Sequence, residues 1–181
     1  MLRALLALGE GVDVVMVLRH GVDAPPKHAR LRVARTDLSA SPAALRFVGE
    51  SLALRPIVRE ARADVVLHES FPVPALGKTP IVLTVHDLRA LDPESRATSL
   101  GRRLLAPSVI RRGLERATRV VAVSKFTRDA VLRFAKLRPE RVAVVLNAAD
   151  HLEPPARPPS REPALVVAVG HLEARKGCDV L

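Results

Sequence analysis

The sequence predicts an α/β protein built on a doubly wound parallel sheet. Short, β-branched apolar runs alternate with longer segments of helical spacing, which is typical of parallel strands joined by right-handed crossovers. Only four of the 181 residues are aromatic, so Val, Leu, Ile and Ala must fill the core, as they do in sheets covered by helices on both faces. Five of the fifteen prolines fall within residues 154–163. Because proline disfavours both helix and strand, this segment divides the chain into two domains.

Each element of the expected fold follows from its apolar period. Continuous apolar runs predict buried strands, and apolar residues three and four apart predict helices. In chain order we expect the end of a helix at 2–8, strands at 12–18 and 31–34, a helix at 43–61, strands at 65–68 and 81–85, a helix within 99–117, a strand at 119–123, a helix at 124–136 and a strand at 142–146. Pro56 should kink or divide the second helix, and Pro107 should interrupt the third, because proline lacks an N–H group. Ser124 and Thr127 suit a helix N-terminus, where a hydroxyl accepts from unpaired backbone N–H groups.

Three domain segments follow from this pattern. Residues 1–150 form the first domain, residues 151–163 a Pro-rich linker, and residues 164–181 the start of a second domain. The strand pattern at 165–169 runs into a polar turn in the same way as the pattern at 142–146.

Composition limits the classes of function. The net charge is +10, and 24 of the 29 basic residues are Arg. These Arg residues are spread along the chain, and stacking aromatics, zinc ligands and a groove-reading basic helix are lacking, so nucleic-acid binding is disfavoured. A basic surface can still serve anionic lipid or a nucleotide diphosphate.

The single cysteine and the first residues bear on the compartment. Cys178 has no partner for a disulfide, which fits a reducing environment. Glu10 and Asp13 interrupt the apolar run near the first residue, so it does not resemble a signal peptide. No apolar run reaches the roughly eighteen residues of a spanning helix. We expect a cytoplasmic protein, with peripheral contact at the inner face of the membrane as a second location.

Ligands of a doubly wound sheet gather at the carboxyl ends of its strands. This rule selects the polar residues that follow each expected strand, namely His68, Glu69, His86, Asp87, Ser124, Asn147 and the segment 170–176.

Five segments carry a resemblance to a known family. They are ADVVLHESFPVP, TPIVLTVHDL, RATRVVAVSKFTRDAV, RVAVVLNAAD and VAVGHLEARKG. Their order and spacing resemble those of retaining glycosyltransferases of family 4, which have the GT-B fold, over roughly residues 43–181. The resemblance implies an acceptor-side Rossmann-like domain followed by a domain for a nucleotide-diphosphate sugar, with no metal or further cofactor. It also implies transfer of the glycosyl group with retention to a glycan or a lipid-linked acceptor.

The resemblance assigns His86 and Asp87 to the catalytic site. His86 would lie near the reacting sugar as a positioning or charge-stabilising group, with Asp87 as a supporting or acceptor contact. Fixed polar groups stabilise a sugar that acquires oxocarbenium character, because they need no reorganisation. Without the resemblance, a His after a strand is more often a hydrogen-bonded structural residue.

The donor diphosphate would be bound by Gly170, His171 and Lys176. Lys176 lies at the start of an expected helix after a Gly-containing turn, where backbone N–H groups and the helix dipole favour a phosphate; otherwise it is a solvated surface Lys. The family pattern has Arg directly after Gly170. His171 is only partly charged at neutral pH and cannot form a bidentate fork, which weakens the prediction of diphosphate binding.

Two further hypotheses stay open. The segment 100–116 places Leu104, Val109, Ile110 and Leu114 near one side and several Arg on another, so it can lie on anionic lipid or pack on the sheet with a solvated basic face. The family's first strand with its glycine-rich loop and its acidic E-x7-E motif find no match. We therefore expect a chain truncated at both ends and inactive alone. A non-catalytic glycan-, lipid- or partner-binding module is the alternative, and a nucleic-acid binder ranks third.

Overall fold

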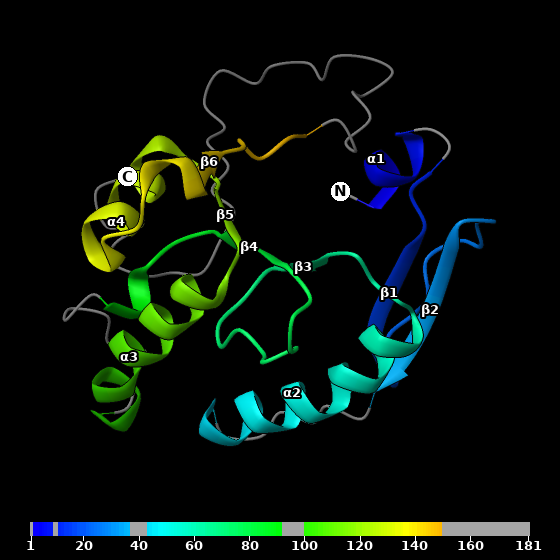
Figure 1. Ribbon diagram of the computed structural model, residues 1–181, viewed down its shortest axis with the longest axis horizontal. Helices are drawn as coiled ribbons and strands as arrows, with labels where there is room; N and C mark the ends of the chain where they lie inside the picture. The colour runs from blue at the N-terminus through cyan, green and yellow to red at the C-terminus, as the bar shows by residue number, and fades with distance from the viewer. Residues whose placement is uncertain (1, 9–10, 37–42, 92–99, 150–181) are drawn as a thin grey trace, which may run out of the picture. The chain divides into compact units, whose positions relative to one another are not determined.

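The computed structural model describes residues 2–8, 11–36, 43–91 and 100–149 (Figure 1). The chain divides into two units, Met1–Asn147 and Ala148–Leu181, and the described residues belong almost wholly to the first. The predicted linker at 151–163 and the second domain at 164–181 lie outside the described residues and stay predictions.

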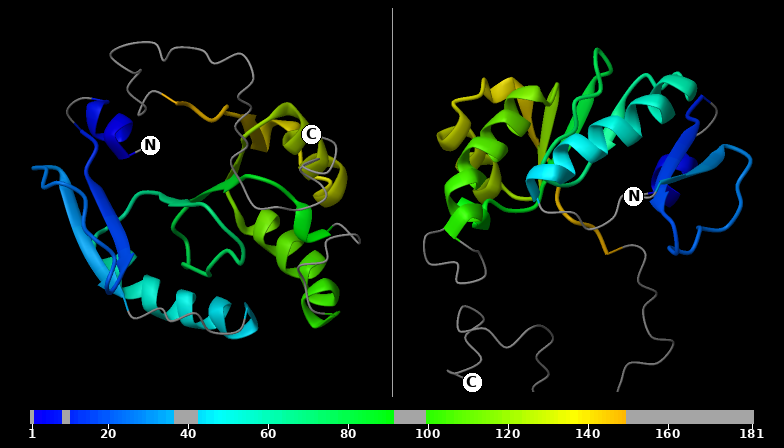
Figure 2. Two further views of the ribbon diagram at one scale, coloured as in Figure 1. Left: turned by 180° about the vertical axis from the view of Figure 1, so that it is seen from behind. Right: turned by 90° about the horizontal axis from the view of Figure 1, so that it is seen from below.

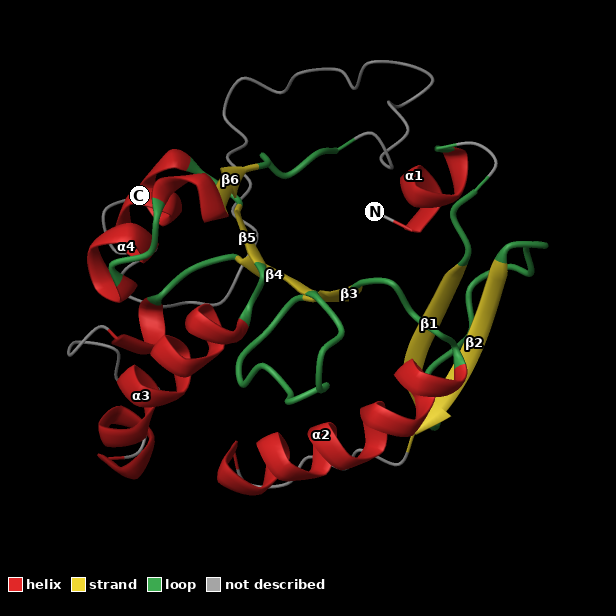
Figure 3. Ribbon diagram, viewed as in Figure 1, coloured by secondary structure: helices red, strands yellow, loops and turns green. Residues whose placement is uncertain are grey.

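Strands and helices alternate along the described chain, as Figure 3 shows. The elements are α1 (Leu2–Ala7), β1 (Val14–Arg19), β2 (Leu31–Thr36), α2 (Ala43–Glu60), β3 (Val66–His68), β4 (Ile81–Val85), α3 (Leu100–Arg116), β5 (Arg119–Ala122), α4 (Lys125–Ala135) and β6 (Val142–Val144), with short 3-10 helices η1 (Arg89–Leu91) and η2 (Pro139–Arg141). All the strand pairs are parallel. The predicted α/β class with parallel sheets is confirmed. The ends of the predicted strands and helices lie within two residues of the observed ends. The two 3-10 helices were not predicted.

The strands divide between two parallel sheets, where the sequence predicts one. One sheet pairs β1 with β2, and the other has the order β3-β4-β5-β6. Within the described residues, β1 has a hydrogen-bonded neighbour, β2, on one edge only, and β3 has one, β4, on one edge only.

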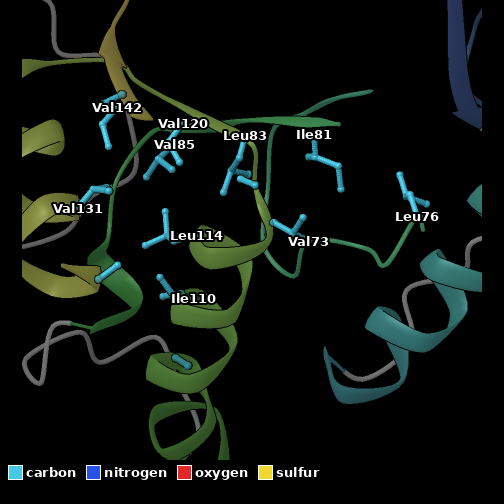
Figure 4. Close-up of a cluster of buried hydrophobic side chains, with 14 residues drawn as sticks. Val73, Leu76, Ile81, Leu83, Val85, Ile110, Leu114, Val120, Val131 and Val142 are labelled. Carbon is cyan, nitrogen blue, oxygen red and sulfur yellow. The ribbon is translucent and has the colours of Figure 1, made fainter. Parts of the chain in front are cut away.

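The core belongs to the four-stranded sheet and the two helices that follow β4 and β5. Alternate residues of β4 are buried, and Leu83 is 0% exposed. Figure 4 shows Leu83 and Val85 on the side of Ile110 and Leu114 of α3 and Val131 of α4, and Ile81 near Val73 and Leu76. In both views of Figure 2, α3 and α4 lie beside this sheet, and the two helices contact each other. Burial of one aliphatic face of each helix on the sheet is the main force that orders this unit.

The segment between β3 and β4 is held by α2 and α3. Arg55 Nε donates to the Ala75 carbonyl at 2.7 Å, and the Ala75 N–H donates to Ser51 Oγ at 2.9 Å. From α3, Arg116 Nη1 donates to the Val73 carbonyl at 2.9 Å. These bonds satisfy backbone groups that a loop could not pair by itself.

Both internal prolines are accommodated without breaking their helices. Pro56 lies inside α2 and Pro107 inside α3. Pro56 therefore does not divide α2, and the expectation that Pro107 interrupts α3 is wrong. Each proline removes one N–H donor, but both are exposed, where water can bond the carbonyl left without a donor. In α3, the buried contacts of Ala106 and Ile110 on either side of Pro107 hold the two turns in line.

Candidate active site at the carboxyl edge of the four-stranded sheet

The register of the sheet brings several predicted site residues to one edge. Val85, the last residue of β4, pairs with Ala122, which in turn pairs with Val144, so β4, β5 and β6 end level with one another. His86 follows directly after β4 and Ser124 two residues after β5. His68 pairs with Leu83 and so lies two residues short of this edge.

The backbone of His86 is fixed by the first turn of α4. Thr127 Oγ1 donates to the His86 carbonyl at 3.3 Å, and Ser124 Oγ donates to Thr127 Oγ1 at 3.0 Å. Ser124 is the N-cap of α4, because its Oγ accepts the Thr127 N–H at 3.0 Å. Thr127 is buried, whereas the side chain of His86 is exposed. The chain thus presents an exposed imidazole on an anchored backbone.

Asp87 is held by its own turn. The Arg89 N–H donates to Asp87 Oδ1 at 3.0 Å, and Arg89 Nε donates to Asp87 Oδ2 at 2.9 Å. Both oxygens of the carboxylate therefore have a partner from η1. This arrangement stabilises the turn after β4, and each carboxylate oxygen keeps a further lone pair for another partner.

The other predicted site residues are not brought together with His86 by any described contact. His68 Nε2 lies 3.2 Å from the Pro72 carbonyl, in the loop that follows its own strand. Glu69 and Asn147 are exposed. The predicted donor residues Gly170, His171 and Lys176 lie outside the described residues, so their role in binding a diphosphate stays a prediction.

Two other features are absent from the described residues. Within residues 2–8, 11–36, 43–91 and 100–149, no group of three or more His, Cys, Asp or Glu side chains is placed to hold a metal ion. Over the same residues, no helix combines the length and apolar character that crossing a membrane requires.

Sequence reasoning missed two parts of this edge. Arg89 gives no local signal of its pairing with Asp87 beyond a spacing of two residues. Thr127 was assigned to a helix start, but its bond to the His86 carbonyl spans 41 residues, so no local pattern can predict it. Chemically, the edge can offer an imidazole as a fixed donor, acceptor or partial cation to a polar ligand.

Comparison with known families agrees with this architecture. The model of Glycosyltransferase Family 4 matches residues 1–151, which is most of the chain. The chain belongs to this family, and its described unit is a glycosyltransferase-type α/β domain. No curated protein matches the chain.

Proposed function

We propose that the described unit is the acceptor-side domain of a retaining glycosyltransferase that uses a nucleotide-diphosphate sugar. In this proposal the acceptor is a glycan or a lipid-linked glycan, and His86 contacts it at the carboxyl edge of the sheet. In this proposal donor binding belongs to residues 164–181, and the 181-residue chain by itself binds acceptor without turning over donor.

One observation carries the proposal: the exposed imidazole of His86 on an anchored backbone, in a chain of a glycosyltransferase family. A catalytic group must be held within a fraction of an ångström of its reacting position, and rigid elements hold it better than loops do. The bonds from Thr127 and Ser124 supply that rigidity. Asp87 supports the same turn through Arg89 and is a positioning residue in this proposal.

The test uses the 181-residue chain and two alkyl glycosides, octyl glucoside and octyl mannoside, as acceptor probes below their micelle concentrations. Binding is measured by saturation-transfer NMR with wild-type protein and His86→Ala. Loss of one polar contact should weaken binding about two- to tenfold. His28→Ala is the matched control, because His28 is also exposed but its Nδ1 accepts the Arg30 N–H far along the chain from β4. His28→Ala should bind as wild type does.

The proposal fails if neither glycoside binds, or if His86→Ala binds as tightly as wild type. Incubation with UDP-sugars and GDP-sugars tests whether the 181-residue chain turns over a donor. Turnover by the 181-residue chain would contradict the proposed inactivity of this chain alone, and an inverted anomer in any product would contradict retention.

A further inference from the structure

The positive charge of this chain is concentrated in one segment. Residues 100–141 contain twelve Lys and Arg but only three Asp and Glu, against totals of 29 and 19 for the chain. Basic residues occur throughout the sequence, yet the acidic residues that balance them elsewhere are scarce here, so the rest of the chain is close to neutral. The segment forms α3, β5, α4 and η2, and Figure 1 shows α3 and α4 along one flank of the four-stranded sheet.

Only some of these cations are available to a partner. Arg116, Arg119 and Arg141 donate to backbone carbonyls of Val73, Glu140 and Leu114, respectively. By contrast, the side chains of Arg112, Arg133 and Lys136 are exposed, and none has an ion pair or hydrogen bond with another described residue.

Arg111 connects the two helices of this layer. Its guanidinium lies 5.0 Å from the centroid of the Phe134 ring in α4. The contact holds a cation at the junction of α3 and α4, where it remains exposed. The two helices thus form one basic surface.

The same surface exposes large apolar side chains. Ala106, Ile110 and Leu114 face the core, so helical spacing places Leu104, Leu105 and Arg112 on the opposite, solvent-facing side of α3. Leu104 is 70% exposed and Leu105 is 56% exposed. In the first turn of α4, Phe126 is 79% exposed. Apolar groups beside unpaired cations are the composition of helices that lie in a lipid interface.

We propose that this α3–α4 surface, defined by Leu104, Leu105, Arg111, Arg112, Phe126 and Arg133, binds an anionic lipid bilayer. The Leu and Phe side chains enter the boundary between headgroups and acyl chains, and the guanidinium groups contact lipid phosphates. Charge complementarity selects anionic lipid. A nucleic acid also offers phosphates, but it gives exposed leucines no apolar phase to enter.

The described parts of these helices carry only two acidic residues, so the repulsion from an anionic surface is small. Glu115 is exposed on α3, and Asp129 of α4 pairs with Arg128 at 3.2 Å. Neither outweighs the cations around it. Phe126 is the second residue of α4, two positions after the N-cap Ser124, so the apolar part of the surface adjoins the edge that carries His86. Bilayer binding requires no sugar transfer and is thus independent of the proposed function.

The experiment is sedimentation of the 181-residue chain with vesicles. One set contains equal parts of phosphatidylglycerol and phosphatidylcholine, and the other contains phosphatidylcholine alone. Wild-type protein should partition onto the anionic vesicles only, and added salt should weaken that binding. Arg112→Glu should lower the partition coefficient about tenfold, because a cation near the surface is replaced by an anion. Leu104→Ser should lower it about three- to tenfold.

Helix α2 provides matched controls, because it exposes Leu52 (64% exposed) and Arg59 but carries a nearly balanced charge. Leu52→Ser and Arg59→Glu should bind the vesicles as wild type does. The proposal is overturned by equal binding to both vesicle types, by no binding, or by α2 variants that weaken binding as much as the α3 variants. Duplex DNA that competes for the protein, with an affinity unaffected by Leu104→Ser, would instead identify a nucleic-acid surface.

Discussion

Strands β1 and β4 are similarly apolar, yet the two sheets of the described residues bury them to different extents. β1 has the sequence VVMVLR, and all its apolar residues are only half-buried. β4 has the sequence IVLTV, and Ile81, Leu83 and Val85 are each at most 3% exposed. The difference lies in what packs on the strand. The four-stranded sheet is covered by α3 and α4. Beyond their own ladder, β1 and β2 are linked to their described surroundings by hydrogen bonds from arginine side chains.

Those arginine bonds show how the smaller sheet is held. Arg30 donates from Nη2 to the Leu6 carbonyl of α1 and from Nη1 to the Val12 carbonyl. Arg35 Nη1 donates to the Arg19 carbonyl at 3.0 Å. Such exposed or half-buried bonds contribute about 1 kcal/mol each, and apolar burial on a covering helix contributes more. An apolar strand is therefore stabilised according to the layer that covers it.

The largest expected effect comes from matched leucines in the two sheets. Leu83→Ala should lower the free energy of unfolding by about 2–5 kcal/mol, because it leaves a cavity in a fully packed core. Leu18→Ala in β1 should lower it by less than half as much, since Leu18 is only half-buried. Denaturant titration measures both losses. Equal losses would show that the covering layer does not determine how much a strand leucine contributes to stability.

The next effect tests how tightly α3 packs on the loop after β3. A Cβ on Gly113 would lie 2.8 Å from Cδ1 of Phe71 and 3.0 Å from Cγ2 of Val73. Gly113→Ala should therefore cost about 1–3 kcal/mol through overpacking, although alanine favours a helix. Adding Phe71→Leu should recover part of the loss in a double-mutant cycle. A stabilised Gly113→Ala protein would show that this junction is loose.

A smaller effect concerns the anchor of the candidate site. Ser124→Ala removes the cap of α4 and the hydroxyl that bonds Thr127, and it should cost about 1 kcal/mol. Ser124→Asp preserves an acceptor at the cap and should stay near wild type in a thermal melt. If Ser124→Ala matched Ser124→Asp, the first turn of α4 would not depend on this cap.

The smallest effect separates two neighbouring arginines of α3. Arg111→Ala removes the contact with the Phe134 ring and should cost about 0.5–1 kcal/mol. Arg112→Ala should change the stability hardly at all, because Arg112 faces solvent without a partner among the described residues. Denaturant midpoints distinguish the two variants. The reverse order would contradict the assignment of Arg112 to the outer surface.

The sequence by itself determined the succession of strands and helices, because a strand or helix is specified by a period that repeats within a few residues. It placed the strand at Ile81–Val85 at its observed limits, the cap at Ser124 and His86 directly after a strand. The sequence also contains the pattern of residues that the family model matches over residues 1–151.

The way in which the strands and helices pair and pack could be seen only in the folded chain. The division into two sheets, the continuity of α3 through Pro107 and the bond from Thr127 to the His86 carbonyl all depend on residues distant in sequence. Pairing and burial are set by which surfaces meet, and packing of that kind overrides local preference. Asp87 illustrates the same reason. The strand pattern predicted its position after β4, but its ion pair with Arg89 depends on the conformation of the folded turn.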